Sequence, residues 1–390
     1  MKKIILSLII GATSLIGGAQ EMTWHSAENL PLIGKAVDDA STSRRYYRVP
    51  DSLQSKVKRD ALMWLGHHSA GMALRFASNS PFISVKWHNL EKALMNHQTP
   101  TGTRGLDLYT LLPDGTWTFV NTARPDVNNH NTAARVISNM EPEMREYMLY
   151  LPLYDGVDSI YIGTAAESVL TQPSAVLPDT SRPIVMYGTS ILQGGCANRP
   201  GMAHSNILTR QLNREVINLG FSGNGQLDLE IADIIAAVPD PGLVVLDCVP
   251  NVNVEQIDTL LVPFYNIIRE KHPDVPILFV EDPLFPHIRF DKEAYNQVTT
   301  LNALWKKRYE QLAAKDPNLH YLTADHIIGT DYEATVDGLH FTDLGFQRYA
   351  NLLEPIIRRI ALPVVKQEIA PQETPLAKDK KDKKAKRSKK

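Results

Sequence analysis

The sequence predicts two parts of different fold class: an all-β sandwich domain, followed by an α/β domain on a parallel sheet. Three observations predict this. Residues 20 to about 165 contain several short strands with no helical pattern between them, which is typical of a sandwich. Residues 171–183 are polar and rich in proline, as in a linker. From residue 184 onward, continuous apolar strands alternate with amphipathic helices, which indicates a parallel sheet covered on both faces.

The first part carries the alternation of apolar and polar residues expected of half-buried strands. Residues 70–87 form two alternating runs, and residues 106–111 form a third that ends at the turn Pro113-Asp114-Gly115. Alternation resumes at residues 116–120, so we expect a hairpin there. Residues 145–153 and 159–162 add further strands.

The second part alternates strand and helix in a regular order. Strands are expected at residues 184–187, 216–219, 243–247, 276–280 and 320–322. Helices are expected at residues 203–214, 228–237, 254–271, 294–314 and 342–360. We therefore predict a β-sandwich domain over residues 20–172, a linker over 173–183 and the α/β domain over 184–362.

Both ends of the chain differ from its body. Lys2 and Lys3, an apolar run and the small residues Gly17-Gly18-Ala19 predict a signal peptide over residues 1–19, cut before Gln20. Residues 363–390 are rich in lysine, and we expect a disordered basic tail that either aids solubility or contacts an anionic surface. No later stretch is long and apolar enough to span a membrane. We expect a periplasmic or secreted protein.

The charge balance and the cysteines limit the function classes further. The chain has a formal net charge of −2 although residues 366–390 hold ten Lys or Arg and only four Asp or Glu. The rest is therefore mildly acidic, which argues against nucleic acid as a partner. Cys196 and Cys248 could form a disulfide in an oxidising compartment, or they are two buried thiols. Sequence leaves this pair open.

Two short segments about 150 residues apart point to chemistry. Gly188-Thr189-Ser190 follows the first strand of the α/β part, and Asp337-Gly338-Leu339-His340 precedes the last helix. A serine hydroxyl is a poor nucleophile unless a base takes its proton. An Asp three residues before a His can accept from Nδ1–H and direct Nε2 at the serine. Taken alone, Ser190 could be a helix cap and His340 a structural residue.

Two further strand ends carry candidate oxyanion donors. Gly223 lies in a glycine-rich loop after the second strand, and Asn251 follows the third. A backbone N–H at Gly223 and the Asn251 side-chain amide could both bind a developing oxyanion. The alternatives are an ordinary βα loop and a turn-forming asparagine. The four segments share one edge of the sheet, where ligands bind in open α/β folds.

These residues carry a resemblance. From about Pro183 to Ile360 the chain resembles the SGNH (GDSL-like) hydrolases, which place Ser, Gly, Asn and His in four blocks in this order. Ser190, Gly223, Asn251 and His340 match the blocks, and Asp337 matches the third triad member. Two departures, Thr189 where Asp is best known and Pro250 where Gly is common, remove no catalytic group. The segment Gly105-Leu106-Asp107-Leu108-Tyr109 is similar to the G-x-D-L-Y signature of a β-sandwich that precedes some members.

The resemblance implies a flavodoxin-like three-layer domain and a serine esterase. Ser190 would be the nucleophile, His340 the base and Asp337 its orienting carboxylate, with Ser190, Gly223 and Asn251 as oxyanion donors. No cofactor is implied. Adjacent histidines at positions 67 and 68 would point to opposite faces of a strand, so no metal site is expected.

The substrate is less defined by the sequence. An exported esterase with a sandwich partner suggests an acylated glycan or small molecule, for example an acetylated carbohydrate. Trp64, Trp87 and Trp117 could stack on sugars or could pack in the core and rim. Arg199 and His204 could shape an acyl pocket or lie on the surface. The alternatives are an esterase or thioesterase acting on a lipid or small-molecule conjugate, and a catalytically silent glycan-binding protein. No oligomeric state is predicted.

Overall fold

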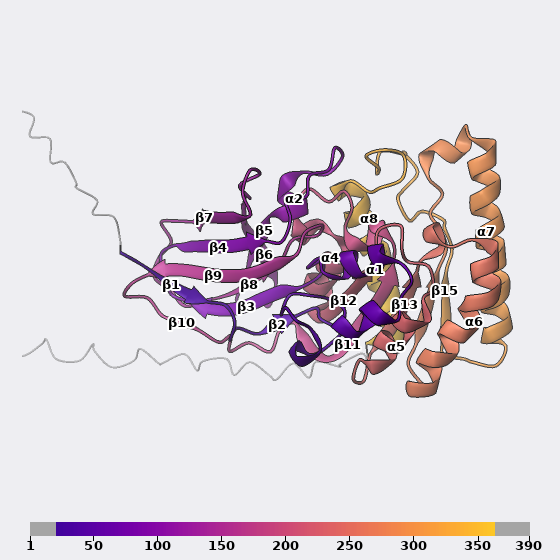
Figure 1. Ribbon diagram of the computed structural model, residues 1–390, viewed down its shortest axis with the longest axis horizontal. Coiled ribbons are helices and arrows are strands. Elements are labelled where there is room, and N and C mark those ends of the chain that lie inside the picture. The colour runs from indigo at the N-terminus through magenta and orange to yellow at the C-terminus, as the bar shows by residue number, and fades with distance from the viewer. Residues whose placement is uncertain (1–20, 363–390) are drawn as a thin grey trace, which may run out of the picture.

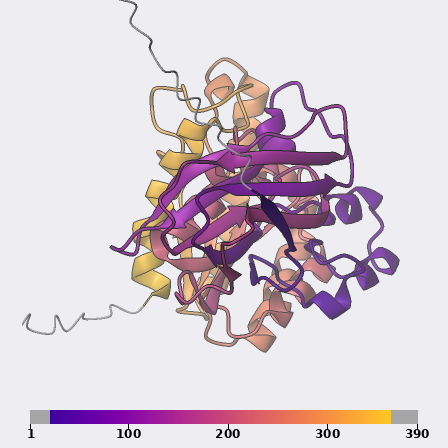
Figure 2. The same cartoon turned by 90° about the vertical axis from the view of Figure 1, so that its left-hand side faces the viewer.

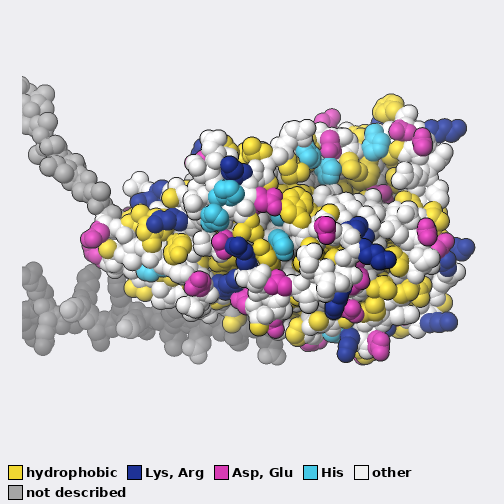
Figure 3. Space-filling view, viewed as in Figure 1, with side chains coloured by type: hydrophobic (Ala, Val, Ile, Leu, Met, Phe, Trp, Pro, Cys, Tyr) yellow, Lys and Arg dark blue, Asp and Glu magenta, His cyan; other side chains and the backbone are white. Residues whose placement is uncertain are grey.

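The computed structural model describes residues 21–362 of the chain (Figure 1). The predicted signal peptide and the predicted basic tail lie outside the described residues. Within residues 21–362, no helix has the length and apolar character needed to cross a membrane. On the face shown in Figure 3, basic and acidic side chains are interspersed.

Two antiparallel sheets make up most of the N-terminal part. The four-stranded sheet has the order β1 (Met22–Ser26), β9 (Val157–Ala165), β4 (Ile83–Asn89), β7 (Asn131–Ile137). The six-stranded sheet has the order β10 (Leu170–Thr171), β3 (Ala73–Ser78), β8 (Arg145–Tyr150), β5 (Leu106–Leu111), β6 (Trp117–Ala123), with β2 (Leu32–Ile33) paired to β3. Figure 2 looks onto the end of the molecule that carries these sheets.

Side chains from both sheets bury one another. Leu74 and Phe76 of β3 share a buried cluster with Ile83 and Val85 of β4. Alternate residues of a strand point to opposite faces, so each sheet turns its apolar face to the other. The predicted hairpin is present, since β5 and β6 pair antiparallel around a turn in which Gly115 has a φ of +82°.

Short helices interrupt the N-terminal part, which the prediction of an all-β domain did not include. They are the 3-10 helices η1 (Asp39–Ser41) and η2 (Asp51–Ser55) and the α-helices α1 (Asp60–Gly66) and α2 (Pro100–Arg104). The expectation that positions 67 and 68 lie on a strand is wrong, because His67 is the C-terminal cap of α1. Its ring stacks on Tyr47, while His68 is buried and contacts Gln193.

The C-terminal part is built on a five-stranded parallel sheet. Its order is β12 (Arg214–Gly220), β11 (Asp179–Gly188), β13 (Leu243–Asp247), β14 (Ile277–Val280), β15 (Leu319–Leu322). This is the 2-1-3-4-5 order of flavodoxin-like sheets. Strand β11 begins five residues before the predicted start. Asp179 already pairs with Arg214, and the register shifts before Ile184, next to a proline that has no N–H to donate.

Helices cover both faces of this sheet. Helices α5 (Leu229–Ala237), α6 (Val254–Lys271) and α7 (Lys292–Ala313) pack on the face that carries Val185 and Tyr187. Helices α3 (Ser190–Gln193), α4 (His204–Leu212) and α8 (Asp343–Ala361) pack on the face that carries Ile184 and Met186. Three further 3-10 turns are η3 (Pro200–Met202), η4 (Val249–Asn251) and η5 (Pro286–Arg289).

The two parts share a core. Val49, Leu53 and Leu65 come from the N-terminal part, yet they belong to the same buried cluster as Val185 of β11. Burying each such side chain contributes about 1.5–3 kcal/mol. Residues of the N-terminal part therefore support the α/β sheet directly.

Candidate functional site

Ser190 lies at the carboxyl edge of the parallel sheet. It is the first residue of α3, directly after β11 ends at Gly188, and its side chain is almost fully buried. A side chain at position 188 would place Cβ 2.5 Å from the Asp247 carbonyl oxygen of the neighbouring strand. Glycine is therefore required for the close exit from the strand. The Thr189 hydroxyl caps α3 by accepting from the N–H of Ile191 at 3.3 Å.

The structure brings Ser190, His340 and Asp337 together. His340 Nε2 lies 3.0 Å from Ser190 Oγ, and His340 Nδ1 lies 2.8 Å from Asp337 Oδ2. When Nδ1–H donates a hydrogen bond to the carboxylate, Nε2 carries the lone pair of the ring and can accept from the serine hydroxyl. The three side chains form one continuous chain of hydrogen bonds across 150 residues of sequence.

The loop that carries Asp337 and His340 is held in place by its own backbone. Asp337 Oδ1 accepts from the N–H of Leu339 at 3.0 Å and from that of His340 at 2.8 Å. Gly338 has a φ of +89°, in the left-handed region that glycine tolerates. The next residues start α8, with Thr342 as its N-cap.

Hydrogen bonds control the ionisation of Asp337. Partial burial would raise the pKa of this carboxyl. The His340 ring and the N–H groups of His340 and Leu339 outweigh burial and hold the pKa at about 2. Asp337 is therefore ionised at neutral pH, as a carboxylate that orients a histidine must be.

Gly223 and Asn251 lie beyond the ends of the strands on either side of β11. Gly188 pairs with Gly220 of β12 and with Asp247 of β13, so all three strands end at the same level. Gly223 has a φ of +67°, and a Cβ built there would meet nothing within 4 Å. Asn251 Oδ1 accepts from the N–H of Gly225 at 3.3 Å, so Nδ2 is the donor that this side chain has to offer.

Three side chains that sequence reasoning missed hold the end of β12 and the loop after it. The Gln193 side chain accepts from the N–H of Ser222 at 2.9 Å and donates to His68 Nδ1 at 3.1 Å. Arg48 donates to the carbonyls of Gly220 and Asn218 at 2.8 and 3.1 Å. Gln193 could have been found from its position one turn after Ser190 in α3. His68 and Arg48 carry no comparable signal, because only the tertiary fold brings them here.

Burial sets the charge of two of these groups. It lowers the pKa of His68 to about 3, so the imidazole is neutral and Nδ1 can accept from Gln193. It lowers the pKa of Arg48 to about 9, which leaves the guanidinium charged at neutral pH. This buried cation lies against the carbonyls at the end of β12, just before the loop that carries Gly223.

The Gly105–Tyr109 signature contacts the segment that follows α3. Arg199 donates to Asp107 Oδ2 at 2.8 Å and to the Tyr109 hydroxyl at 2.7 Å, and the N–H of Gly201 donates to the same Asp107 oxygen at 2.8 Å. Arg199, expected either at an acyl pocket or on the surface, is thus a partly exposed residue held by an ion pair. The signature ties the N-terminal part to the chain just beyond the serine.

Several other expectations are corrected by burial. His204 is fully buried against Phe346 and Tyr349, so it lies neither in an acyl pocket nor on the surface. Trp87 and Trp117 are buried, as the packing interpretation expected, whereas Trp64 is 45% exposed. Cys196 and Cys248 are both free and buried, so they form no disulfide.

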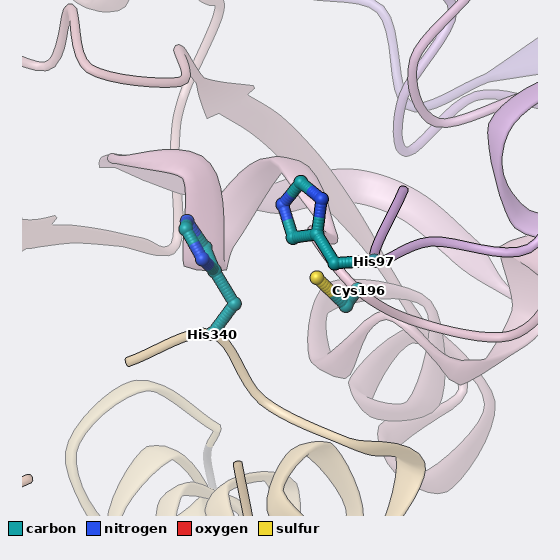
Figure 4. Close-up of side chains that lie close together, drawn as sticks. All are labelled: His97, Cys196 and His340. Atoms are coloured by element: carbon teal, nitrogen blue, oxygen red, sulfur yellow. The ribbon is translucent and has the colours of Figure 1, made fainter. Parts of the chain in front are cut away.

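A histidine of the N-terminal part lies beside the candidate triad. The His97 ring centroid is 5.5 Å from that of His340, and Cys196 lies next to both (Figure 4). Burial and the nearby charge of Asp337 raise the pKa of the Cys196 thiol to about 12. Neither residue was predicted from the sequence to lie at the site.

Comparisons with known proteins agree with this architecture. Residues 181–358 match the model of the GDSL-like lipase/acylhydrolase family, and residues 22–170 match the model of the N-terminus of SGNH-hydrolase-type esterases, named GxDLY. No curated protein matches the sequence.

Three solved structures are similar over most of the chain. A GDSL-like lipase from Bacteroides ovatus is 35% identical, covers 87% of this chain and 98% of its own, and has a TM-score of 0.81. A salicylyl-acyltransferase of a tetracycline biosynthetic pathway is 18% identical, covers 87% and 96%, and has a TM-score of 0.69. A family two carbohydrate esterase from Cellvibrio japonicus is 14% identical, covers 87% and 98%, and has a TM-score of 0.55. At 18% and 14% identity, the acyltransferase and the carbohydrate esterase show that the fold is shared and no more.

The family matches and the 35% identity over nearly the full length of a solved relative confirm the resemblance read from the four sequence blocks. The chain belongs to the GDSL-like lipase/acylhydrolase family, and it is an ester-hydrolysing serine hydrolase with the N-terminal GxDLY part found in SGNH-type esterases.

Proposed function

We propose that the protein is an exported serine esterase that removes short acyl groups, for example acetyl, from a carbohydrate or another small acylated molecule. The observation that carries the proposal is the chain of hydrogen bonds from Ser190 through His340 to Asp337. A nucleophile, its base and the group that orients the base are the parts that acyl transfer needs.

The reaction follows from the positions of these atoms. Ser190 Oγ attacks the ester carbonyl while His340 Nε2 takes the hydroxyl proton. The imidazolium, held by Asp337, then protonates the leaving alcohol and leaves an acyl-serine. Water attacks this ester by the same route, with His340 as base, and the acid departs. No metal or cofactor takes part in these steps.

Three donors are proposed to bind the negative charge on the carbonyl oxygen. They are the backbone N–H groups of Ser190 and Gly223 and the Nδ2 amide of Asn251. Such donors lower the barrier because they are already oriented toward the charge that develops in the transition state. Gln193 and Arg48 support Gly223 by fixing the chain that leads into its loop, at Ser222 and at Gly220, the last residue of β12.

The substrate class rests on exposure and on the fold. Asp337 and His340 are 37% and 19% exposed, so the site opens to solvent and could accept a short acyl group on a large carrier. The similar fold of a carbohydrate esterase favours a glycan over a lipid. Hydrolysis rates with nitrophenyl esters of increasing chain length, and with acetylated sugars, test this choice. A preference for long acyl chains would favour the lipid alternative.

The decisive experiment is Ser190→Ala, with Ser222→Ala as a control that removes a nearby hydroxyl and keeps its backbone N–H. We expect Ser190→Ala to lower turnover of a short acyl ester by about 10⁴–10⁶-fold, since members of a triad act as a unit. The control should change turnover only a few-fold. An organophosphonate should label Ser190, and labelling of another residue would reject the assignment.

The domain limits and the export of the protein belong to the same proposal. We infer a sandwich domain over residues 20–172, a linker over 173–183 and a hydrolase domain over 184–362. Export rests on Lys2, Lys3 and the apolar run before Gln20. N-terminal sequencing of the protein from a cell fractionation should find Gln20 first, in the periplasm or the medium.

A further inference from the structure

One group of metal-binding side chains is found among residues 21–362, and it lies at the candidate active site. It consists of His97, Cys196 and His340, whose ligand atoms all lie within 4.8 Å of one another (Figure 4). The three residues come from three segments: the loop before α2, the segment after α3 and the loop before α8. The proposed hydrolysis uses only His340 of the three.

The ligand types select a narrow class of metal ion. Two imidazole nitrogens and one thiolate suit Zn²⁺ and related thiophilic cations, and they do not suit Mg²⁺ or Ca²⁺, which prefer oxygen. A tetrahedral zinc ion needs ligand atoms roughly 3.5 Å apart, given Zn–N and Zn–S bonds of about 2.1 and 2.3 Å. Atoms within 4.8 Å of one another reach that spacing by small side-chain movements.

His97 is oriented by its neighbour in the sequence. Its Nδ1 lies 2.9 Å from the side-chain oxygen of Asn96, which can only accept. Nδ1 therefore carries the proton, and Nε2 carries the lone pair that a metal would bind. A hydrogen bond of this kind to the second ring nitrogen is usual for histidines that bind metals.

Binding of a metal at this cluster conflicts with catalysis. His340 already uses Nδ1 toward Asp337 and Nε2 toward Ser190. Coordination of the ring must displace one of these partners, so either the serine loses its base or the base loses its orienting carboxylate. Cys196 would bind as the thiolate and release its proton to solvent.

We propose that a zinc-class cation binds reversibly to His97, Cys196 and His340 and holds the enzyme inactive, with water as the fourth ligand. The binding site is argued from the cluster alone, whereas the inhibition rests on the proposed function. Two separate readouts therefore test the proposal.

The first readout is binding, measured without any substrate. Co²⁺ added to the full chain should produce the near-ultraviolet charge-transfer band of a cobalt–thiolate bond. Cys196→Ser should abolish the band, and His97→Ala should weaken binding at least tenfold, since even loss of a partner that only orients a ligand costs about 10–100-fold. Ser190→Ala should keep the band, so a failure of the proposed esterase function would not affect this result.

The second readout is zinc inhibition of ester hydrolysis, reversed by EDTA. His97→Ala and Cys196→Ser should keep the basal turnover and need at least tenfold more Zn²⁺ for half-inhibition. Cys248→Ala removes the other free thiol, and His130→Ala breaks the stacked pair of His88 and His130 on the N-terminal sheets. Both controls should be inhibited like the parent enzyme.

Two results would overturn the proposal. One is the absence of a cobalt–thiolate band in the parent protein. The other is unchanged zinc inhibition in both His97→Ala and Cys196→Ser, which would place the inhibitory ion elsewhere. If Cys196→Ser does not fold, His97→Gln decides the question, because this half-exposed side chain can be changed without opening the core.

Discussion

Asp107 provides a test of how the N-terminal part supports the active site. Its side chain is fully buried and accepts from Arg199 at 2.8 Å, from the N–H of Gly201 at 2.8 Å and from the Thr122 hydroxyl at 2.7 Å. Asp107→Ala removes the carboxylate that accepts all three hydrogen bonds and leaves the Arg199 guanidinium, 23% exposed, without its partner.

The expected loss of stability follows from this burial. Removing one partner of a buried ion pair lowers the free energy of unfolding by about 3–5 kcal/mol, whereas an exposed ion pair contributes about 0–1 kcal/mol to stability. Arg199 keeps its bond to Tyr109 and some contact with water, so we expect the lower end, about 3 kcal/mol. Because the Arg199–Gly201 segment follows the helix that begins at Ser190, turnover should also fall under conditions where the variant is folded.

Equilibrium unfolding in urea measures the change, with Asp258→Ala as the control. Asp258 pairs with Arg308 across helices α6 and α7, and both side chains are partly exposed, so its loss should cost less than about 1 kcal/mol. A double-mutant cycle with Arg199→Ala isolates the pairwise energy. If Asp107→Ala costs no more than the control, the reasoning about burial is wrong.

Three further variants test individual groups. Asp337→Asn should lower kcat by on the order of 10³-fold, less than for a buried carboxylate because water reaches the site; an unchanged kcat would remove Asp337 from the mechanism. Asn251→Ala should lower kcat by about 10²–10³-fold with little change in KM, and a change in KM alone would contradict its role in the transition state. Asp247 accepts from the Tyr349 hydroxyl at 2.9 Å, and burial raises its pKa to about 7 from an ordinary value of 3.8. Above about pH 4 the unfolded chain releases this proton and the folded chain keeps it, so the parent should lose on the order of 4 kcal/mol between pH 4 and 7 relative to Asp247→Asn. Urea unfolding of both proteins across this range gives their free energies of unfolding at each pH. If these change with pH in the same way for both proteins, the prediction is wrong.

The sequence predicted the C-terminal sheet and its helices well, for a physical reason. Parallel strands covered on both faces are continuous apolar runs, and β13 (Leu243–Asp247) and α6 (Val254–Lys271) have the predicted limits. The positions of Ser190 and His340 could also be inferred. Strand ends of an open α/β sheet share one edge, so residues after different strands meet whatever their distance in sequence.

Contacts between the two parts could not be predicted in the same way. Arg48 lies in a segment with no regular pattern, and only the folded chain places it against the Gly220 carbonyl. Arg199 and His204 were assigned to a pocket or the surface because they follow the serine closely. A helix of four residues and the turn after it carry them further along the chain, Arg199 into an ion pair with the buried Asp107 and His204 into a fully buried position.

The N-terminal part reaches the candidate site at three places, and each acts on a different element. Arg48 holds the end of β12, just before the loop that carries Gly223, Asp107 holds the segment beyond Ser190, and His97 lies beside His340. The first two contacts are hydrogen bonds to backbone or to a paired charge, so they fix geometry. At the third place, the His97 ring is partly exposed. Its Nδ1 is bonded to Asn96, so Nε2 is the nitrogen that can bind a ligand. A hydrolase part without the N-terminal part would keep Ser190 and His340 yet lose the contacts of Arg48 with the end of β12, just before the loop that carries Gly223. The two parts therefore share both a buried core and the surroundings of the candidate site.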